Sequence, residues 1–256
     1  MTNTFADHNG EKGIDLYEVT NLLFNGNQTS FNNWRGAAGN FTGWDVSGMK
    51  ACRLHNAVIS NYVAAYNQTG GLWLDTDASG VQLTGVQLCN NLTNGLFIEV
   101  SEGPVGIQST SMLNNGGNGL QVANSAAINL SNSTAYANVR SLWIGGTDSP
   151  AKVTNFETGN VYWLYSQGMT LQHNSLVGTN SSQWLLSTSL SSSWPTFMHT
   201  LNSDFNDWYD PRNPTPIWTP AGGLSVGQWQ STTGEDNHSV ATAPTLTIPG
   251  SCGVMD

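Results

Sequence analysis

The sequence predicts an all-β protein that folds as a single-stranded right-handed parallel β-helix, a solenoid of stacked coils. Three observations support this prediction: a repeat of about 24 residues, short alternating apolar segments within each repeat, and an asparagine that closes each repeat. The repeats open with the segments Gly71–Asp75 (GLWLD), Gly95–Glu99 (GLFIE), Gly119–Ala123 (GLQVA) and Ser141–Gly145 (SLWIG).

Each repeat contains a second apolar alternation, found at residues 81–83 (VQL), 105–107 (VGI) and 128–130 (INL). Short period-2 segments that are interrupted by glycine and asparagine indicate strands. The aliphatic positions alternate in step from repeat to repeat, so they are expected to point inward and to stack in apolar rows. The asparagines that close the repeats, and that are expected to hydrogen-bond the turn backbone at one corner, are Asn67, Asn91, Asn115 and Asn138.

The pattern extends less regularly toward the two ends of the chain. Residues 13–17 (GIDLY) predict an early coil that closes near Asn33, and residues 34–47 are then expected to form an inserted loop. A second interruption covers roughly residues 146–160 and carries Glu157. Beyond residue 190 the repeat fades.

Both ends of a solenoid must be covered, because a bare coil exposes unpaired strand edges and an open core. Residues 190–256 are therefore expected to form a last degenerate coil and an irregular tail that caps the C-terminal end. Residues 1–9 are too few and too polar to form a good cap at the other end. The chain is expected either to begin inside a longer protein or to form a homodimer through its open N-terminal coil. Since no linker divides the sequence, residues 1–256 are expected to form one domain.

The composition excludes several classes of function. The chain has 7 lysine and arginine residues against 17 aspartate and glutamate residues, and its formal net charge is −10. It therefore lacks the basic surface that binds nucleic acid. No apolar run approaches the length that spans a membrane, and the chain shows no signal peptide. Cys52, Cys89 and Cys252 are too few and too scattered for a disulfide framework or a zinc motif.

The residues between the inward-pointing positions are expected to share one outer face. Asp75, Asp77 and Glu99 cluster there, and closely placed carboxylates can separate into an acid and a base. Lys50 is a candidate catalytic cation and Arg53 a candidate substrate-binding cation. The aromatic residues expected to stack on sugar rings are Trp73, Phe97, Trp143 and Tyr17.

The same residues also allow purely structural roles. The carboxylates could keep the outer face soluble, the aromatic side chains could stack on one another as a ladder, and the cations could offset the acidic charge. These alternatives remain open at the level of the sequence.

Residues 71–77 (GLWLDTD) and 95–101 (GLFIEVS) resemble the repeat-containing right-handed parallel β-helix proteins of bacteria. The tail at residues 229–239 (WQSTTGEDNHS) is similar to the segment that often ends these proteins. The resemblance covers most of the chain and points to the wider pectate-lyase-like superfamily. It implies a carbohydrate-active protein with a polysaccharide substrate and a secreted or cell-surface location. The chain lacks polygalacturonase-like Asn-Thr-Asp and Gly-His-Gly elements, so the resemblance does not extend to that activity.

Three functions fit these residues. In a glycoside hydrolase, Asp75 and Glu99 on stacked positions would lie about 5 Å apart, as in a retaining pair. Asp77 and Glu99 on a diagonal would lie about 7–8 Å apart, nearer to an inverting pair. In a polysaccharide lyase, Asp75, Asp77 and Glu99 would bind Ca²⁺ while Lys50 or Arg53 abstracts a sugar proton. The third function is glycan binding without catalysis.

The charge of the chain favours the first of these functions. A strongly acidic protein repels a polyuronate, so hydrolysis of a neutral glycan is the leading hypothesis. No cofactor is expected, apart from Ca²⁺ if the lyase hypothesis holds.

Overall fold

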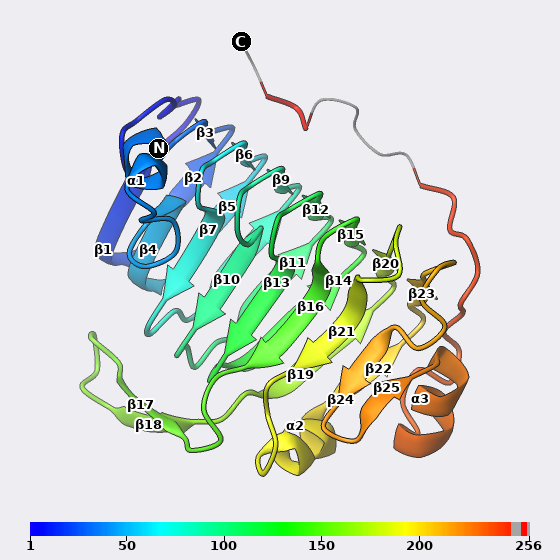
Figure 1. Ribbon diagram of the computed structural model, residues 1–256. Coiled ribbons are helices and arrows are strands. Elements are labelled where there is room, and N and C mark those ends of the chain that lie inside the picture. The colour runs from blue at the N-terminus through cyan, green and yellow to red at the C-terminus, as the bar shows by residue number, and fades with distance from the viewer. Residues whose placement is uncertain (247–251, 255–256) are drawn as a thin grey trace.

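The computed structural model describes residues 1–246 and 252–254 and confirms the parallel β-helix (Figure 1). Each full coil contributes one strand to each of three sheets that run along the solenoid. The first sheet is parallel except at its last strand, and its order is β1 (Ile14–Thr20), β4 (Ser47–His55), β7 (Gly70–Asp75), β10 (Leu96–Glu99), β13 (Asn118–Ala123), β16 (Arg140–Gly145), β21 (Trp184–Thr188), β24 (Ile217–Thr219) and β25 (Gly222–Leu224).

The other two sheets are parallel throughout and contain seven strands each. The second sheet contains β2 (Leu23–Asn25), β5 (Val58–Ser60), β8 (Val81–Thr84), β11 (Val105–Gln108), β14 (Ala126–Ser131), β19 (Gln167–Gln172) and β22 (Asn202–Asp204). The third contains β3 (Gln28–Ser30), β6 (Val63–Ala65), β9 (Gln87–Cys89), β12 (Ser111–Leu113), β15 (Thr134–Tyr136), β20 (Ser175–Val177) and β23 (Asp207–Tyr209).

The coils stack in the register that the apolar pattern predicts. In the first sheet, Leu72 pairs with Leu96, Leu96 with Leu120, and Leu120 with Leu142. These four side chains are at most 1% exposed and belong to one apolar core inside the solenoid. Because burial of a leucine side chain contributes about 1.5–3 kcal/mol, the repeated inward rows stabilise the stack at every coil.

A ladder of buried amides closes one corner of the coils, as the repeated asparagines predict. The side chain of Asn67 donates to Asn91 at 2.9 Å, Asn91 donates to Asn115 at 3.0 Å, and Asn115 donates to Asn138 at 2.9 Å. Each of these three residues also donates its backbone N–H to the same acceptor oxygen. The ladder therefore satisfies turn backbone that no strand pairs.

The early coil closes one residue before the expected position. Asn32, rather than Asn33, joins the ladder, because its side-chain amide donates to Asn67 at 3.0 Å. Asn33 has a positive φ of 66° and precedes the short helix α1 (Trp34–Ala38). The inserted segment at residues 34–47 consists of this helix and of the loop that leads into β4.

The second interruption of the repeat is a β-hairpin. Strands β17 (Ala151–Thr154) and β18 (Val161–Leu164) pair antiparallel between β16 and β19. In Figure 1 the hairpin projects beyond the ends of the first-sheet strands. The sequence predicted a break in the repeat here but not the structure inside it.

The C-terminal region forms one more coil and a cap. After helix α2 (Trp194–Thr200), strands β22, β23 and β24 complete the coil, and β25 and helix α3 (Val226–Thr233) follow it. The buried carboxylate of Asp236 accepts hydrogen bonds from the indole nitrogens of Trp208 at 3.0 Å and Trp229 at 2.8 Å. Among the described residues, no helix is long and apolar enough to cross a membrane.

Residues before β1 continue the solenoid as a partial coil. Thr2 pairs with Asn25, and Phe5 pairs with Gln28, both in parallel. This segment leaves the end of the core partly open. The half-buried residues that pack against the core there are Ile14, Leu16, Val19 and Leu22.

Candidate active site

The outer face of the first sheet carries two rows of side chains, because strand residues point alternately inward and outward. The aromatic row consists of Lys50, Trp73, Phe97, Gln121 and Trp143. The carboxylate row lies two residues further along each strand and consists of Tyr17, Cys52, Asp75 and Glu99. Lys50 is thus aligned with Trp73.

A cleft of about 580 Å³ opens over β7 and β10, and we call it the carboxylate cleft. Its lining residues are Gly43, Trp44, Lys50, Trp73, Asp75, Thr76, Phe97, Glu99 and Val100. Five of the site residues predicted from the sequence therefore lie together, namely Asp75, Glu99, Lys50, Trp73 and Phe97. The inserted segment at 34–47 supplies one wall of the cleft through Gly43 and Trp44.

Lys50 is held in place by two carboxylates. Its ammonium lies 3.0 Å from an oxygen of Asp75 and 2.8 Å from an oxygen of Asp45. Burial lowers the pKa of Lys50, but the hydrogen bonds to these carboxylates outweigh burial and leave the pKa raised. Lys50 is therefore a fixed cation beside Asp75, and it is poorly suited to abstract a proton.

Glu99 lies directly beside Asp75 in the register of β7 and β10. Burial of the Glu99 carboxyl raises its pKa, and the neighbouring Asp75 raises it further, whereas Lys50 opposes the increase. The charge of Asp75 is compensated by its ion pair with Lys50. The two carboxyl groups therefore meet different surroundings within one cleft.

Asp77 does not share the outer face, and the expectation that it would is wrong. Thr76 and Asp77 both have positive φ, 47° and 61°, so the backbone leaves the strand after Asp75 and the alternation ends. The Asp77 side chain is completely buried and lies 3.1 Å from His55 instead. Asp75, Asp77 and Glu99 thus do not form the three-carboxylate Ca²⁺ site of the lyase hypothesis, and the diagonal Asp77–Glu99 pair is not formed either.

Trp73 and Phe97 stack on each other, with ring centroids 5.1 Å apart. The Lys50 ammonium lies 4.1 Å from the centroid of the Trp73 ring. The two aromatic side chains therefore form a ladder along the sheet, one of the structural roles that the sequence left open. They contribute to the wall of the cleft while part of their ring surface is already in contact with neighbours.

The remaining predicted site residues lie outside the carboxylate cleft. Tyr17 is 63% exposed at the N-terminal edge of the first sheet, and the Arg53 guanidinium lies 5.5 Å from its ring centroid. Arg53 also forms an ion pair with Glu18. Trp143 lies on β16, further along the aromatic row, where it lines a second cavity.

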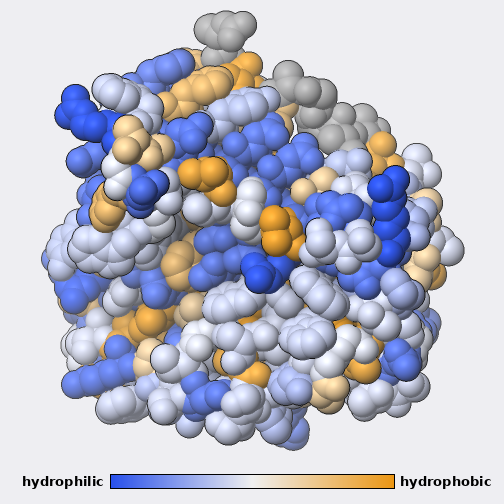
Figure 2. Space-filling model, viewed as in Figure 1, coloured by the Kyte–Doolittle hydropathy of each residue, from blue (hydrophilic) through white to orange (hydrophobic). Residues whose placement is uncertain are grey.

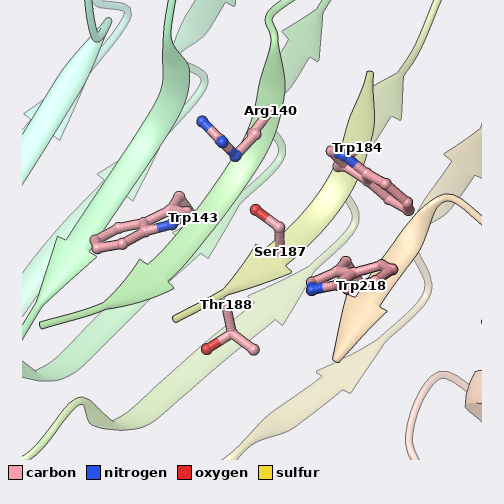
Figure 3. A pocket seen from close by; sticks show the side chains of 6 residues that line it. All are labelled: Arg140, Trp143, Trp184, Ser187, Thr188 and Trp218. Carbon is pink, nitrogen blue, oxygen red and sulfur yellow. The ribbon is translucent and has the colours of Figure 1, made fainter. Parts of the chain in front are cut away.

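The second cavity, which we call the distal cavity, has a volume of about 320 Å³ (Figure 3). Trp143 lies on one side of it and Trp184 and Trp218 lie on the other, with Arg140 and Ser187 between them. The rings of Trp184 and Trp218 meet edge to face with centroids 5.2 Å apart. Both cavities open on the same sheet face, which carries separate small apolar spots rather than one broad apolar patch in the view of Figure 2.

Sequence reasoning missed three of the aromatic residues that line the two cavities. Trp44 is 75% exposed and belongs to an insertion with no repeat to align. Trp184 and Trp218 lie where the repeat has faded. The only available signal was that these tryptophans occur in polar segments of the sequence. This signal does not say where they lie relative to the cleft.

No family model and no curated protein matches the sequence. Among solved structures, the chain is similar to the A-module of the mannuronan C-5 epimerase AlgE4 of Azotobacter vinelandii, with a TM-score of 0.62 and 16% identity over 93% of this chain and 56% of that one. It is also similar to the A-module of the mannuronan C-5 epimerase AlgE6 of the same organism, with a TM-score of 0.55 and 12% identity over 94% of this chain and 57% of that one. The chain spans a little more than half of each of these structures. At such identities, the similarity shows the shared parallel β-helix fold.

Proposed function

We propose that the chain is a carbohydrate-active enzyme that cleaves glycosidic bonds of a polysaccharide with retention of configuration. The observation that carries this proposal is the pair Asp75 and Glu99, which lie on directly paired strand positions in one cleft. Paired strands are about 4.8 Å apart, close to the carboxylate separation of retaining glycosidases. Because Asp77 is completely buried and does not line the cleft, it does not serve Glu99 as a partner at the longer spacing of an inverting pair.

The surroundings of the two carboxyl groups assign their roles. Glu99 has a raised pKa and would donate its proton to the glycosidic oxygen as the bond to the leaving sugar breaks. The Asp75 carboxylate would attack the anomeric carbon and form a glycosyl ester. The Glu99 carboxylate would then take a proton from water as that water attacks the ester, which releases the sugar and regenerates both groups.

The two cavities support a polymeric substrate. They lie on one face of the first sheet, and the aromatic row connects β7 and β10 at the carboxylate cleft with β16 at the distal cavity. A glycan that runs along the solenoid could contact both cavities at once. Tryptophan rings with free faces are suited to the apolar C–H surfaces of sugars, as they are to other flat apolar groups.

A second candidate function is C-5 epimerisation of a uronate polymer. It is favoured by the names of the structural neighbours and by Arg140 in the distal cavity, which forms no ion pair with any described residue and could bind a uronate carboxylate. The environment of Lys50, which is bound to Asp45 and Asp75, makes it a poor base for this reaction. We therefore place hydrolysis first.

External nucleophiles can test the assigned roles. The protein would be assayed on a panel of neutral and uronate polysaccharides. The Asp75→Ala and Glu99→Ala variants would then be assayed, with and without sodium azide, on an activated aryl glycoside of the cleaved glycan, whose leaving group departs without an acid. Azide should restore turnover of both variants, with an inverted glycosyl azide from Asp75→Ala and a retained one from Glu99→Ala. Glu11→Gln, which changes an exposed carboxylate before β1, serves as the control and should behave like the unmodified chain.

Other products would contradict the hydrolase proposal. Full activity of both alanine variants would exclude the pair from catalysis. Uronate epimers detected by NMR, or unsaturated products detected by ultraviolet absorbance, would replace hydrolysis by the second candidate or by elimination. Glycan binding without turnover would leave only a binding function.

A further inference from the structure

A second group of ionisable side chains lies just beyond the ends of the strands that form the carboxylate cleft. His55 is the last residue of β4, Asp77 follows β7 by two residues, and Glu102 follows β10 by three. His55 is 2% exposed and Asp77 is completely buried, while Glu102 is half-buried. One ligand atom from each of the three side chains lies within 4.8 Å of the other two.

The hairpin β17–β18 hydrogen-bonds each of these three side chains. The backbone N–H of Phe156 donates to Asp77 at 2.8 Å, and the side-chain amide of Asn155 donates to Glu102 at 2.9 Å. Nδ1 of His55 lies 2.6 Å from a carboxylate oxygen of Glu157. One atom of each side chain is therefore satisfied by the insertion at 146–160.

The other polar atom of each side chain has no hydrogen-bond partner. Nε2 of His55, Oδ1 of Asp77 and Oε2 of Glu102 are all buried, and none forms a hydrogen bond with a described residue. Buried polar atoms are nearly always satisfied, so three unpaired ones that point toward the same space require an explanation. Two of the three side chains are more than nine-tenths buried.

The contact between His55 and Asp77 sharpens the problem. Nε2 of His55 lies 3.1 Å from Oδ1 of Asp77 without hydrogen-bond geometry. Burial lowers the pKa of His55, but the carboxylates of Glu157 and Asp77 outweigh burial and leave this pKa raised, so the surroundings favour a positive charge at the imidazole. A proton on the ring would supply that charge, and so would a metal ion bound to Nε2.

We propose that His55, Asp77 and Glu102 bind one divalent transition-metal ion of the zinc type. One imidazole nitrogen and two carboxylate oxygens form a donor set that suits Zn²⁺ and is less suitable for Ca²⁺, which takes oxygen ligands. Bond lengths of about 2.0–2.1 Å place two ligand atoms of a tetrahedral zinc site about 3.3 Å apart, close to the 3.1 Å between His55 and Asp77. All three ligand atoms lie within 4.8 Å of one another, and the half-buried Glu102 side chain has room to adjust as an ion binds.

The contacts of the hairpin are those expected around a metal site. Histidine ligands usually donate their second ring N–H to a carboxylate, and Nδ1 of His55 is placed to do so to Glu157. Carboxylate ligands are in turn hydrogen-bonded, as Asp77 and Glu102 are. The ring of Phe156 packs against His55 with centroids 4.4 Å apart and covers the group with apolar surface. A bound ion would therefore join the hairpin to three successive coils, and it would fix the turns that follow Asp75 and Glu99.

Calorimetry on the full chain tests the site independently of any enzymatic activity. Metal would be removed with a chelator, and ZnCl₂ would be titrated into the protein by isothermal titration calorimetry. We expect one Zn²⁺ per chain and a rise in Tm of several degrees, because an ion that binds the folded state stabilises it. Glu102→Gln and His55→Gln should each weaken Zn²⁺ binding at least tenfold.

His238→Gln is the matched control. The exposed His238 contacts the half-buried Asp204 at 2.7 Å, and no third ligand among the described residues completes a metal-binding group there, so its replacement should leave Zn²⁺ affinity unchanged. Glu102→Gln retains a side chain of the same shape at a half-buried position, which keeps the test interpretable if His55→Gln fails to fold.

The main competing explanation is a proton. Burial raises the pKa of Glu102 and the nearby Asp77 raises it further, so these two groups could share a proton beside a charged imidazole. The proposal is overturned if Zn²⁺ produces no binding heat, or if Glu102→Gln binds Zn²⁺ as tightly as the unmodified chain. A larger rise in Tm with CaCl₂ than with ZnCl₂ would also overturn it.

Discussion

Two carboxyl groups on neighbouring strands differ in charge environment although they share one cleft. Asp75 contacts the ammonium of Lys50, and Glu99 is half-buried with a raised pKa. The difference arises because Lys50, on β4, lies next to Asp75 on the neighbouring strand β7, whereas Glu99 lies one strand further away on β10. A general acid with a raised pKa stays protonated to higher pH, which suits the role proposed for Glu99.

The pH dependence of kcat/KM follows from this environment. The proton on Glu99 is lost as pH rises through its raised pKa, so activity should fall on the basic side of the profile. Lys50 opposes the increase in this pKa, and Lys50→Gln should therefore move the basic limb to higher pH, whatever it does to the maximum rate. The measurement is kcat/KM across the pH range on the cleaved glycan.

The matched control for this prediction is Lys152→Gln. Lys152 is an exposed lysine on β17, and its replacement should leave the basic limb where it is. A limb that moves to lower pH in Lys50→Gln would show that the acid is a group other than Glu99.

At the scale of elements, the strands of the first sheet supply the charged floor of the cleft, whereas the inserted segment at 34–47 supplies a wall. Trp44 stands at 75% exposure in this segment and meets Phe41 edge to face, with ring centroids 6.0 Å apart. Because Trp73 already contacts both Phe97 and Lys50, Trp44 offers the larger free aromatic surface. It is the better candidate for stacking on a sugar ring.

Trp44→Ala should therefore weaken substrate binding without affecting stability. Loss of one aromatic contact of about 0.5–1.5 kcal/mol corresponds to a rise in KM of roughly two- to twelvefold. Since the side chain is largely exposed, Tm should change little. The comparison variant is Trp163→Ala, which removes a similarly exposed tryptophan from β18. Equal KM values for the two variants would remove Trp44 from the binding site.

At the scale of the whole molecule, the two ends of the solenoid differ. The C-terminal end is covered by β25 and α3, and the carboxylate of Asp236 links Trp208 and Trp229 inside this cap. At the N-terminal end the partial coil leaves core residues half-exposed, and Leu23 next to them is 68% exposed. Partly exposed core side chains at a sheet edge favour association with another apolar surface.

Association through the N-terminal coil should therefore depend on protein concentration. Multi-angle light scattering is expected to show a growing average mass as concentration rises. Leu22→Asp places a charge on the half-buried end and should keep the chain monomeric. Leu92→Asp, at an exposed position away from this end, should associate like the unmodified chain. A constant monomer mass at every concentration would contradict the predicted homodimer.

The sequence by itself determined the solenoid and the pairing of its coils. Leucine at 72, 96, 120 and 142 and asparagine at 67, 91, 115 and 138 recur at nearly constant spacing, and each coil contacts mainly its neighbours. A constant repeat length therefore converts directly into strand register. For the same reason, the spacing of 24 residues between Asp75 and Glu99 is enough to predict that they lie side by side.

Only the tertiary structure decided what the turns and insertions do. Asp77 continues the alternation of β7 in the sequence, yet left-handed backbone at Thr76 and Asp77 directs its side chain into a buried cluster. Glu157 approaches His55 across a hundred residues, and Trp44 reaches the cleft from a segment outside the repeat. Such contacts depend on the direction that the chain takes after a strand ends. A periodic sequence pattern carries no information about that direction. The repeat thus predicts the rows of the sheet, whereas the surroundings that set charge and access depend on the folded insertions.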